Sequence, residues 1–405
     1  MGRVLYGPAG MGPEPPLPEK SGTTRLSPLD ALRGMAAILI AGVQHYQHFG
    51  GDKKRYPFAS HSVPAFIYEY GWLFVDFFFV MSGVVFTHRY LEPIARRRVT
   101  RREFFVLRLS RLYPLHVLTL VVCATVEWTL MVRHKPPVIY DHNDVAHFVL
   151  QLLYLQTWFA KGFAYNEPSW SVAAEVFVYG VFFVVASRYA KAFVGASALI
   201  VFVGVAAQTG VLPFINDPVA RALTGFFVGA LVYHVIRWAD AEGYGDRLGW
   251  GCLGVLAIFV ALGWFIGVSE FVGLSPLPYG LFLFPLAIVA SLKVRPLAWA
   301  LSARPLTYLG DVSYSVYLVH VPLQMIVLAT ATAYKVRIPT EDARVLATYV
   351  ATVIAVGSAT YFWFERPAQK WLRERWLERS PQLSAATVAA AGVRAGSGSA
   401  AARPD

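Results

Sequence analysis

Residues 29–48 combine an apolar helical sequence with ionisable side chains near both ends. Asp30 and Arg33 lie three residues apart, a spacing that puts them on one helix face, and His45 follows near the other end. Ionisable groups are expensive on an apolar membrane helix, so they are candidates for function. A neutral imidazole is well suited to removing a proton near pH 7. The structural alternative, which this stretch alone favours, is that His45 satisfies a polar neighbour and Arg33 anchors the helix end.

Two further segments carry polar residues that chemistry can use. Ser82 follows an aromatic run that contains Asp76, and it is a candidate nucleophile, although its Ser–Gly pair also permits close helix packing. Asp76 needs a partner in such surroundings. Arg108 and Arg111 form a guanidinium pair that can bind phosphates, or that serves membrane topology alone.

The sequence NEPSWSVAAE carries Trp170, Ser171 and, about one turn further, Glu175. Glu175 can orient a histidine or arginine of the first helix, or it is a buried structural carboxylate paired with an arginine. In GDVSYSVYLVH, Tyr317 and His320 share a helix face at three-residue spacing. Single histidines in membrane helices usually pack or form hydrogen bonds, so we assign His320 a secondary role.

The composition places these residues in a membrane protein. Of 405 residues, 56% are hydrophobic and only 15% are charged, whereas soluble domains carry about a quarter charged residues. Mean hydropathy is +0.48. The net charge of +11 does not indicate nucleic-acid binding, because the basic residues fall between apolar segments as the positive-inside rule predicts. With only Cys123 and Cys252, a disulfide framework or a thiolate zinc site within one chain is excluded.

The apolar segments predict an all-α, polytopic membrane helix bundle of about ten transmembrane helices. Residues 147–159 are too short for a crossing and predict a re-entrant or interfacial segment. A basic loop over residues 91–112 and later arginine-rich loops predict that both termini are cytoplasmic. We expect disordered tails at residues 1–27 and 380–405 around a membrane domain of residues 28–379. The predicted crossings are residues 29–49, 63–88, 112–131, 168–186, 192–212, 219–236, 249–268, 277–292, 306–329 and 343–364.

Taken together, the motifs resemble the acyltransferase 3 family of integral-membrane O-acyltransferases. The resemblance rests on DALRG with a downstream histidine, DFFFVMSG, RLSRLYP, NEPSWSVAAE, GDVSYSVYLVHVPL and FERP, which span residues 26–367. Each motif is weak alone, but their joint order and spacing are a strong signal. We expect the single-domain form, without a fused esterase-like domain.

The resemblance implies ten membrane helices, an acyl-CoA donor (by default acetyl-CoA) on the cytoplasmic side, and an acceptor hydroxyl, usually on a glycan. It implies membrane lipid as the surroundings, the plasma (inner) membrane as the location, and no metal, nucleic acid or tightly bound cofactor. The implied catalytic residues are Arg33, His45, Ser82 and Glu175. The residues implied for the donor are Arg108, Arg111, Trp170 and Ser171.

The first helix departs from the family pattern in its spacing. The family usually has ten residues between the arginine and the histidine, whereas residues 34–44 make eleven. At about 100° per residue, the usual spacing leaves the two side chains about 20° apart, and the present one about 120° apart. Gln44 would then align with Arg33. A single π-bulge would restore the alignment of His45, and such bulges are common at functional sites.

These residues lead to a hypothesis of O-acyl transfer, with the acceptor, the acyl length and the oligomeric state left open. His45 removes the acceptor proton as the hydroxyl oxygen attacks the thioester carbonyl, or an acyl-enzyme forms at His45 or Ser82. The alternative is a transporter or flippase of a lipid-linked glycan or small molecule, which moves its substrate without consuming acyl groups. A non-catalytic membrane scaffold is the third class.

Overall fold

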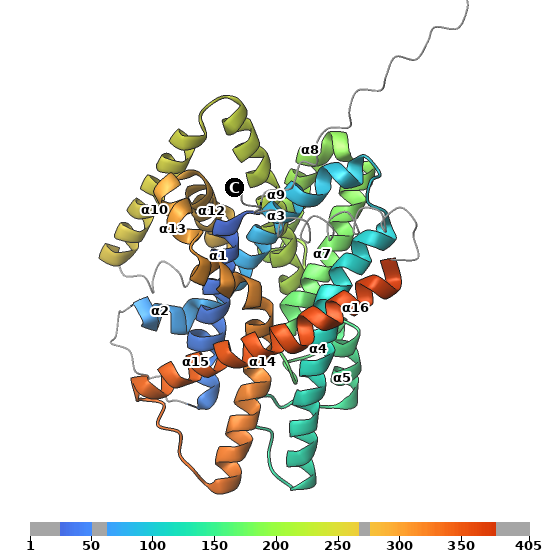
Figure 1. The fold of residues 1–405 in the computed structure, drawn as a ribbon, viewed down its shortest axis with the longest axis vertical. Helices are drawn as coiled ribbons and strands as arrows, with labels where there is room; N and C mark the ends of the chain where they lie inside the picture. Colours follow the sequence, from blue (N-terminus) through green and yellow to red (C-terminus); the bar gives the residue numbers. More distant parts are fainter. Residues whose placement is uncertain (1–24, 51–62, 267–275, 378–405) are drawn as a thin grey trace, which may run out of the picture.

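The computed structural model describes residues 25–50, 63–266 and 276–377, so the predicted tails lie almost entirely outside the described residues. Within these ranges the chain is helical and contains no strand (Figure 1). Eight described helices are long and apolar enough to cross a membrane, and Tyr279–Lys293 with Arg295–Leu301, bent by 91°, makes a ninth. Residues 27–49 form a further helical unit of mixed winding. The predicted all-α membrane bundle is therefore confirmed.

The described elements include π and 3-10 segments, which are labelled η. In chain order the elements are α1 (Ser27–Ile38), η1 (Leu39–Val43), η2 (Gln44–Phe49), α2 (Val63–Tyr70), η3 (Gly71–Leu73), α3 (Phe74–Ala95), α4 (Arg101–Val132), α5 (Val145–Leu152), α6 (Gln156–Phe159), α7 (Ser169–Arg188), η4 (Ala190–Ala192), α8 (Phe193–Gln208), α9 (Asp217–Ala241), α10 (Gly245–Ile266), η5 (Tyr279–Leu283), α12 (Phe284–Lys293), α13 (Arg295–Leu301), α14 (Arg304–Tyr334), α15 (Ala343–Thr360), η6 (Tyr361–Glu365) and α16 (Arg366–Leu377).

Helix α1 packs along α14 near the middle of the bundle (Figure 1). The contact depends on two glycines, because a Cβ at Gly34 would overlap the backbone of Leu309 and Gly310, and a Cβ at Gly310 would overlap the backbone of Asp30. Small residues let membrane helices approach this closely. The approach sets the polar residues of the first helical unit against the polar face of α14.

An aromatic core holds α3, α4, α7 and α9 together. Phe86 of α3 stacks on Tyr179 of α7 with 4.2 Å between ring centroids. Phe104 of α4 and Phe226 of α9 are fully buried around this pair. Burial of several aromatic rings gives dense, directional packing. The core thereby fixes α3 against α7, the two helices that carry Ser82 and Glu175.

The predicted basic loop over residues 91–112 is wrong. Helix α3 continues to Ala95, and α4 already begins at Arg101, so only residues 96–100 connect the two helices. Thr100 and Glu103 form a reciprocal capping box that starts α4 a full three turns before the apolar run. Arg108 therefore lies within a helix and not in a loop.

The last predicted crossing also continues further than expected. After α15, the π-helical η6 leads directly into α16, and α16 packs along α4. Residues 147–159 form only the short helices α5 and α6, in agreement with the predicted incomplete crossing.

The winding of the first helical unit changes between Arg33 and His45. The α-helix ends at Ile38, a π-helical turn covers Leu39–Val43, and a 3-10 helix covers Gln44–Phe49. The sequence left open whether a π-bulge interrupts this helix, and the structure contains one. A wider turn absorbs the extra residue of this sequence. Gln44, which a uniform α-helix would align with Arg33, packs against the position of Gly71, and His45 faces α14.

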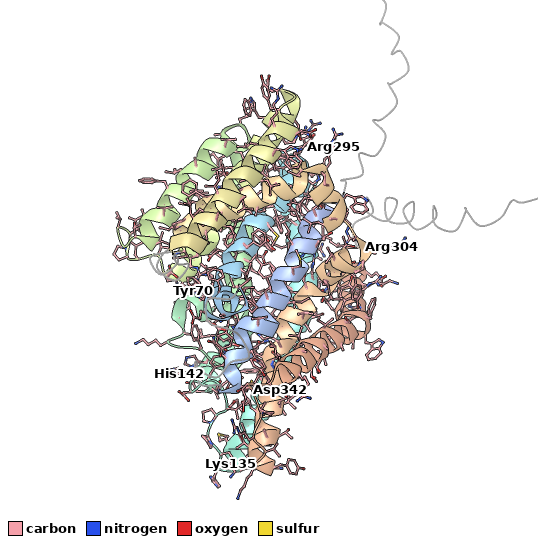
Figure 2. The ribbon with its side chains drawn as sticks, turned by 90° about the vertical axis from the view of Figure 1, so that its left-hand side faces the viewer. Tyr70, Lys135, His142, Arg295, Arg304 and Asp342 are labelled. Carbon is pink, nitrogen blue, oxygen red and sulfur yellow. The ribbon has the colours of Figure 1, made fainter. Side chains whose placement is uncertain are left out.

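One end of the bundle carries the arginine cluster of residues 96–102. Arg295 and Arg304 lie toward one end, and Lys135 lies at the other (Figure 2). At the first end, Arg102 of α4 donates to the carbonyl of Trp376 in α16, and Lys293 pairs with Asp240. We call this the basic end; its residues include Arg96, Arg97, Arg98, Arg101, Arg102, Lys293, Arg295 and Arg304.

Candidate active site

His45 belongs to a group of buried imidazoles between η2 and α14. Its Nδ1 lies 2.6 Å from Nε2 of His320, and the two rings are within 12° of coplanar. The ring centroids are 4.7 Å apart, nearly as far as they can be when two rings in one plane meet through these nitrogens. The contact is therefore a hydrogen bond in the ring planes and not a stack. Gln324, one turn beyond His320, donates to the carbonyl oxygen of His45 at 2.7 Å. His320 is therefore the direct hydrogen-bond partner of His45. This corrects the expectation that His320 has only a secondary role.

The hydrogen bonds assign the tautomers of this pair. The carbonyl oxygen of Tyr317, 2.7 Å from Nδ1 of His320, can only accept, so Nδ1 of His320 carries the hydrogen. Nε2 of a neutral His320 is then an acceptor, and Nδ1 of His45 donates to it. Nε2 of His45 is left with a free lone pair, and it makes no hydrogen bond to a described residue. With 9% of its surface exposed, His45 is positioned to take a proton from a small group.

His48 extends this group away from the basic end. Its Nδ1 donates to Oε1 of Gln324 at 3.0 Å, and its ring centroid lies 4.8 Å from that of His45. The Tyr140 hydroxyl lies 3.5 Å from both Nε2 of His48 and Oε2 of Glu167. Apolar surroundings raise the pKa of the Glu167 carboxyl to about 7. Sequence reasoning did not single out Tyr140 or Glu167; its one signal was that Glu167 belongs to the NEPSWS motif.

A second polar group lies nearer the basic end. The Ser82 hydroxyl donates to Oε1 of Glu175 at 2.5 Å, and the Ser315 hydroxyl donates to Oε2 of the buried Glu365 at 2.6 Å. Glu365 is the acid of the FERP motif, which sequence reasoning used for the resemblance but not for the site. Ser82 has a carboxylate partner and no imidazole beside it among the described residues, so its geometry differs from that of a histidine-activated nucleophile.

Two incompletely paired arginines belong to this second group. Arg33 donates to Asp30, as its spacing predicted, but its Nε is enclosed without a partner. Arg111 makes no hydrogen bond to a described residue, and it lies within electrostatic reach of Arg33, Glu175 and Glu365. Glu175 lies within electrostatic reach of both guanidinium groups, so this carboxylate offsets part of the repulsion between them. Their free donors suit a phosphate or a similar anion.

The predicted site residues thus fall into two levels. Arg33, Arg111, Ser82 and Glu175 form the level nearer the basic end. His45 lies about 18 Å further along its helix from Arg33, at 1.5 Å per residue. Glu175 accepts a hydrogen bond from Ser82 and makes none to His45. Of the two first-helix residues that Glu175 was expected to orient, Arg33 is therefore the one that remains.

Ser171 and Arg108 lie at the margins of these levels. The Ser171 hydroxyl is 3.0 Å from that of Tyr317, the residue whose carbonyl oxygen holds His320. The Arg108 guanidinium lies 4.9 Å from the centroid of Phe86 and 4.7 Å from that of Tyr90, and it donates to the Tyr90 hydroxyl. Arg108 is therefore held by aromatic packing, and its contact with a phosphate stays a prediction.

Asp76 is paired with the cationic side chain that its buried position requires. Arg221 of α9 binds both carboxylate oxygens of Asp76, at 3.0 and 2.8 Å. The same guanidinium lies between Trp72 and Trp170, 5.1 and 5.4 Å from their ring centroids. Trp170 thus packs on a buried ion pair, and its predicted place in donor binding stays a prediction.

We expect Arg221→Ala to lower the free energy of unfolding by about 3–5 kcal/mol, because it leaves the Asp76 carboxylate buried and unpaired. The measurement is thermal or denaturant unfolding of the purified protein in detergent. Asp240→Ala is the control: the Asp240–Lys293 pair has a side chain 40% exposed, against 6% for Asp76, and such pairs contribute about 1 kcal/mol or less. Equal losses for the two variants would contradict the buried pair.

The fold and the site define an integral-membrane protein whose helix bundle encloses a hydrogen-bonded imidazole pair. The model of the family described as "Acyltransferase domain" matches residues 27–364, and the chain belongs to this acyltransferase 3 family. The expected family is confirmed, and the protein is an acyltransferase. No solved structure matches the chain.

Two curated relatives match parts of the chain. "Protein 2 in picA locus" of Rhizobium radiobacter is 33% identical over 165 residues, which cover 38% of this chain and 78% of that protein. "Acyltransferase MdmB" of Streptomyces mycarofaciens is 27% identical over 162 residues, which cover 39% of this chain and 38% of that protein. The similarity therefore concerns less than half of this chain in each case.

Proposed function

We propose that this acyltransferase moves an acyl group, by default acetyl, from acyl-CoA to a hydroxyl of a glycan or glycan-like acceptor. The observation that carries the proposal is the hydrogen bond from His45 to His320. It holds one imidazole in the tautomer that accepts a proton at Nε2, inside the helix bundle of an acyltransferase.

In the proposed reaction, Nε2 of His45 removes the proton of the acceptor hydroxyl while that oxygen attacks the thioester carbonyl carbon. The new carbon–oxygen bond forms, and the carbon–sulfur bond breaks as the tetrahedral intermediate collapses. The leaving thiolate takes the proton from the His45 imidazolium, so the enzyme returns to its starting state. His320 keeps accepting from Nδ1 of His45 throughout.

The donor would enter from the basic end, which we propose to be cytoplasmic together with both termini, in a plasma membrane. Arg33 and Arg111 are proposed to hold an anionic part of acyl-CoA, because their guanidinium groups retain free donors. The thioester arm would then extend along the first helical unit toward His45. Direct transfer spares the charged donor a passage through lipid.

The function is tested with purified protein in lipid vesicles, labelled acetyl-CoA and a panel of glycans. The proposal predicts free CoA and a labelled ester in equal amounts, both dependent on the acceptor. A transporter or flippase would move the glycan without releasing CoA, and that result would overturn the proposal.

We expect Arg111→Ala to raise the KM for acyl-CoA about tenfold, since a hydrogen bond to a charged group contributes about 1.5–3 kcal/mol. The measurement is the initial rate of CoA release at varied acyl-CoA. Arg101→Ala, which changes an exposed arginine near the start of the same helix, is the control and should leave this KM within twofold. The same KM for both variants would remove Arg111 from the donor site.

A further inference from the structure

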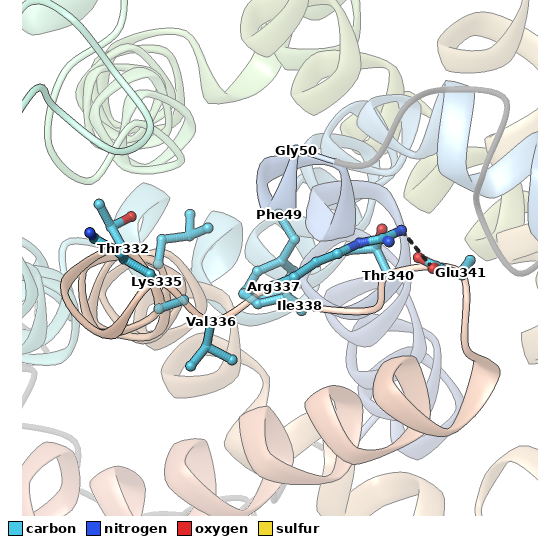
Figure 3. A pocket seen from close by; sticks show the side chains of 11 residues that line it. Phe49, Gly50, Thr332, Lys335, Val336, Arg337, Ile338, Thr340 and Glu341 are labelled. Carbon is cyan, nitrogen blue, oxygen red and sulfur yellow. Dashed lines mark hydrogen bonds and ion pairs between the residues drawn. The ribbon is translucent and has the colours of Figure 1, made fainter.

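A cavity of about 460 Å³ lies where η2 and α14 both end, away from the basic end (Figure 3). Phe49 of η2 and the following Gly50 line one side, and Lys335, Arg337 and Glu341 line it from the segment after α14. Small-molecule sites typically have volumes of about 300–1,000 Å³. The cavity is therefore large enough for a sugar unit.

The two elements that carry the imidazole pair both continue from it to this cavity. Its residues Leu328 and Ala331 follow His320 and Gln324 at intervals of three or four, so they share one face of α14, and Lys335 directly follows the end of that helix. Leu328 lies about 12 Å beyond His320 along that helix at 1.5 Å per residue. On the other element, Phe49 follows His48 directly, and the Tyr46 hydroxyl donates to the Thr340 carbonyl oxygen at 3.3 Å.

The lining combines an aromatic ring with charged groups. Arg337 reaches Glu341 at 2.8 Å, so these two charges balance each other (Figure 3). Lys335 forms no ion pair with a described residue, so among the described lining residues its ammonium is the charge without a counter-charge. A carboxylate is the natural counter-charge for such a group.

The backbone of Lys335 adds an independent observation. Lys335 closes α14 in the left-handed conformation, with φ of 57°, a position that glycine usually occupies at helix ends. A lysine pays a steric penalty there that glycine does not. A strained residue beside a cavity is a reason to look for a function of its side chain.

We infer that this cavity binds a sugar unit of the acceptor that carries a carboxylate, with Lys335 as the partner of that carboxylate. The inference rests on the proposed function and adds a substrate class to it: an acidic polysaccharide or another uronic-acid-bearing glycan. The sugar bound here would lie beyond the reacting hydroxyl, and the imidazole pair would receive a neighbouring unit.

The test uses two matched probes, methyl β-D-glucuronide and methyl β-D-glucoside, titrated against the full chain in detergent by ligand-observed NMR. We expect the glucuronide to bind at least tenfold more tightly. Lys335→Gly should abolish this difference while keeping the unfolding temperature, because glycine suits the left-handed conformation. Arg344→Gly is the control, since Arg344 pairs with Asp342 outside the cavity lining.

Equal affinity for the two probes, or a preference that survives Lys335→Gly, would overturn the inference, as would the absence of binding. The titration needs no acyl donor, so its outcome is separate from that of the CoA-release assay. Selective binding without CoA release would keep the site and discard the proposed function. CoA release without selective binding would keep the proposed function and discard the site.

Discussion

His45→Asn should lower the rate of acyl transfer by about 10²- to 10⁴-fold, the range that a general base contributes. The asparagine amide nitrogen can replace Nδ1 of the imidazole as donor to His320, so the contact to α14 is kept. What is lost is the basic nitrogen at the position of Nε2. The loss should appear in kcat, with little change in the KM for acyl-CoA. The measurement is the rate of labelled ester formation in lipid vesicles.

The matched control for this variant is His48→Asn. His48 lies three residues further on the same 3-10 helix and donates its Nδ1 to Gln324, a contact that asparagine can also make. We expect less than a tenfold loss, because His48 has no donor–acceptor contact with His320. Equal losses at both positions would mean that the histidine group acts as a packing unit and not through one base.

His320→Ala should lower kcat by about 10²-fold or more, as expected when the partner that orients a reacting imidazole is removed. His45 Nδ1 would lose its acceptor, and the ring would be free to rotate or to change tautomer. His320→Gln is the informative second variant, since its carbonyl oxygen can accept from His45 in place of Nε2. The measurement is kcat and KM for both substrates.

Partial recovery of kcat in His320→Gln, with normal donor KM in both variants, would identify His320 as a positioning residue. A structural role alone predicts something different: the two variants would lose activity in proportion to their loss of unfolding temperature. If His320→Ala kept full activity at normal stability, the assigned tautomer of His45 would be wrong.

Local patterns account for what the sequence predicted well. The apolar runs indicated an all-α membrane bundle, and three-residue spacing paired Asp30 with Arg33. The surplus residue before His45 raised the question of a π-bulge, which the structure answers with the π-helical turn Leu39–Val43. Each of these depends on neighbours within a few turns of one helix. The start of α4 is an exception, because the capping box at Thr100 begins this helix well before the predicted residue 112.

Contacts between distant helices account for what the sequence could not supply. His45 and His320 are 275 residues apart, and only the close packing of α1 on α14 at Gly34 and Gly310 brings them together. The partner of Asp76 could have been any buried cation; its identity as Arg221 follows from the pairing of α3 with α9. Periodicity places residues on a helix face, but it does not say which helix that face meets.

The decisive measurement uses vesicles that carry the protein in one orientation. Labelled acetyl-CoA is supplied at the basic end, and a glycan acceptor is supplied on the opposite side of the membrane. We predict that labelled ester accumulates on the acceptor side with the native chain and that His45→Asn forms none above background. Undiminished ester formation by His45→Asn, or passage of unlabelled acceptor across the membrane in place of ester formation, would contradict acyl transfer at the imidazole pair.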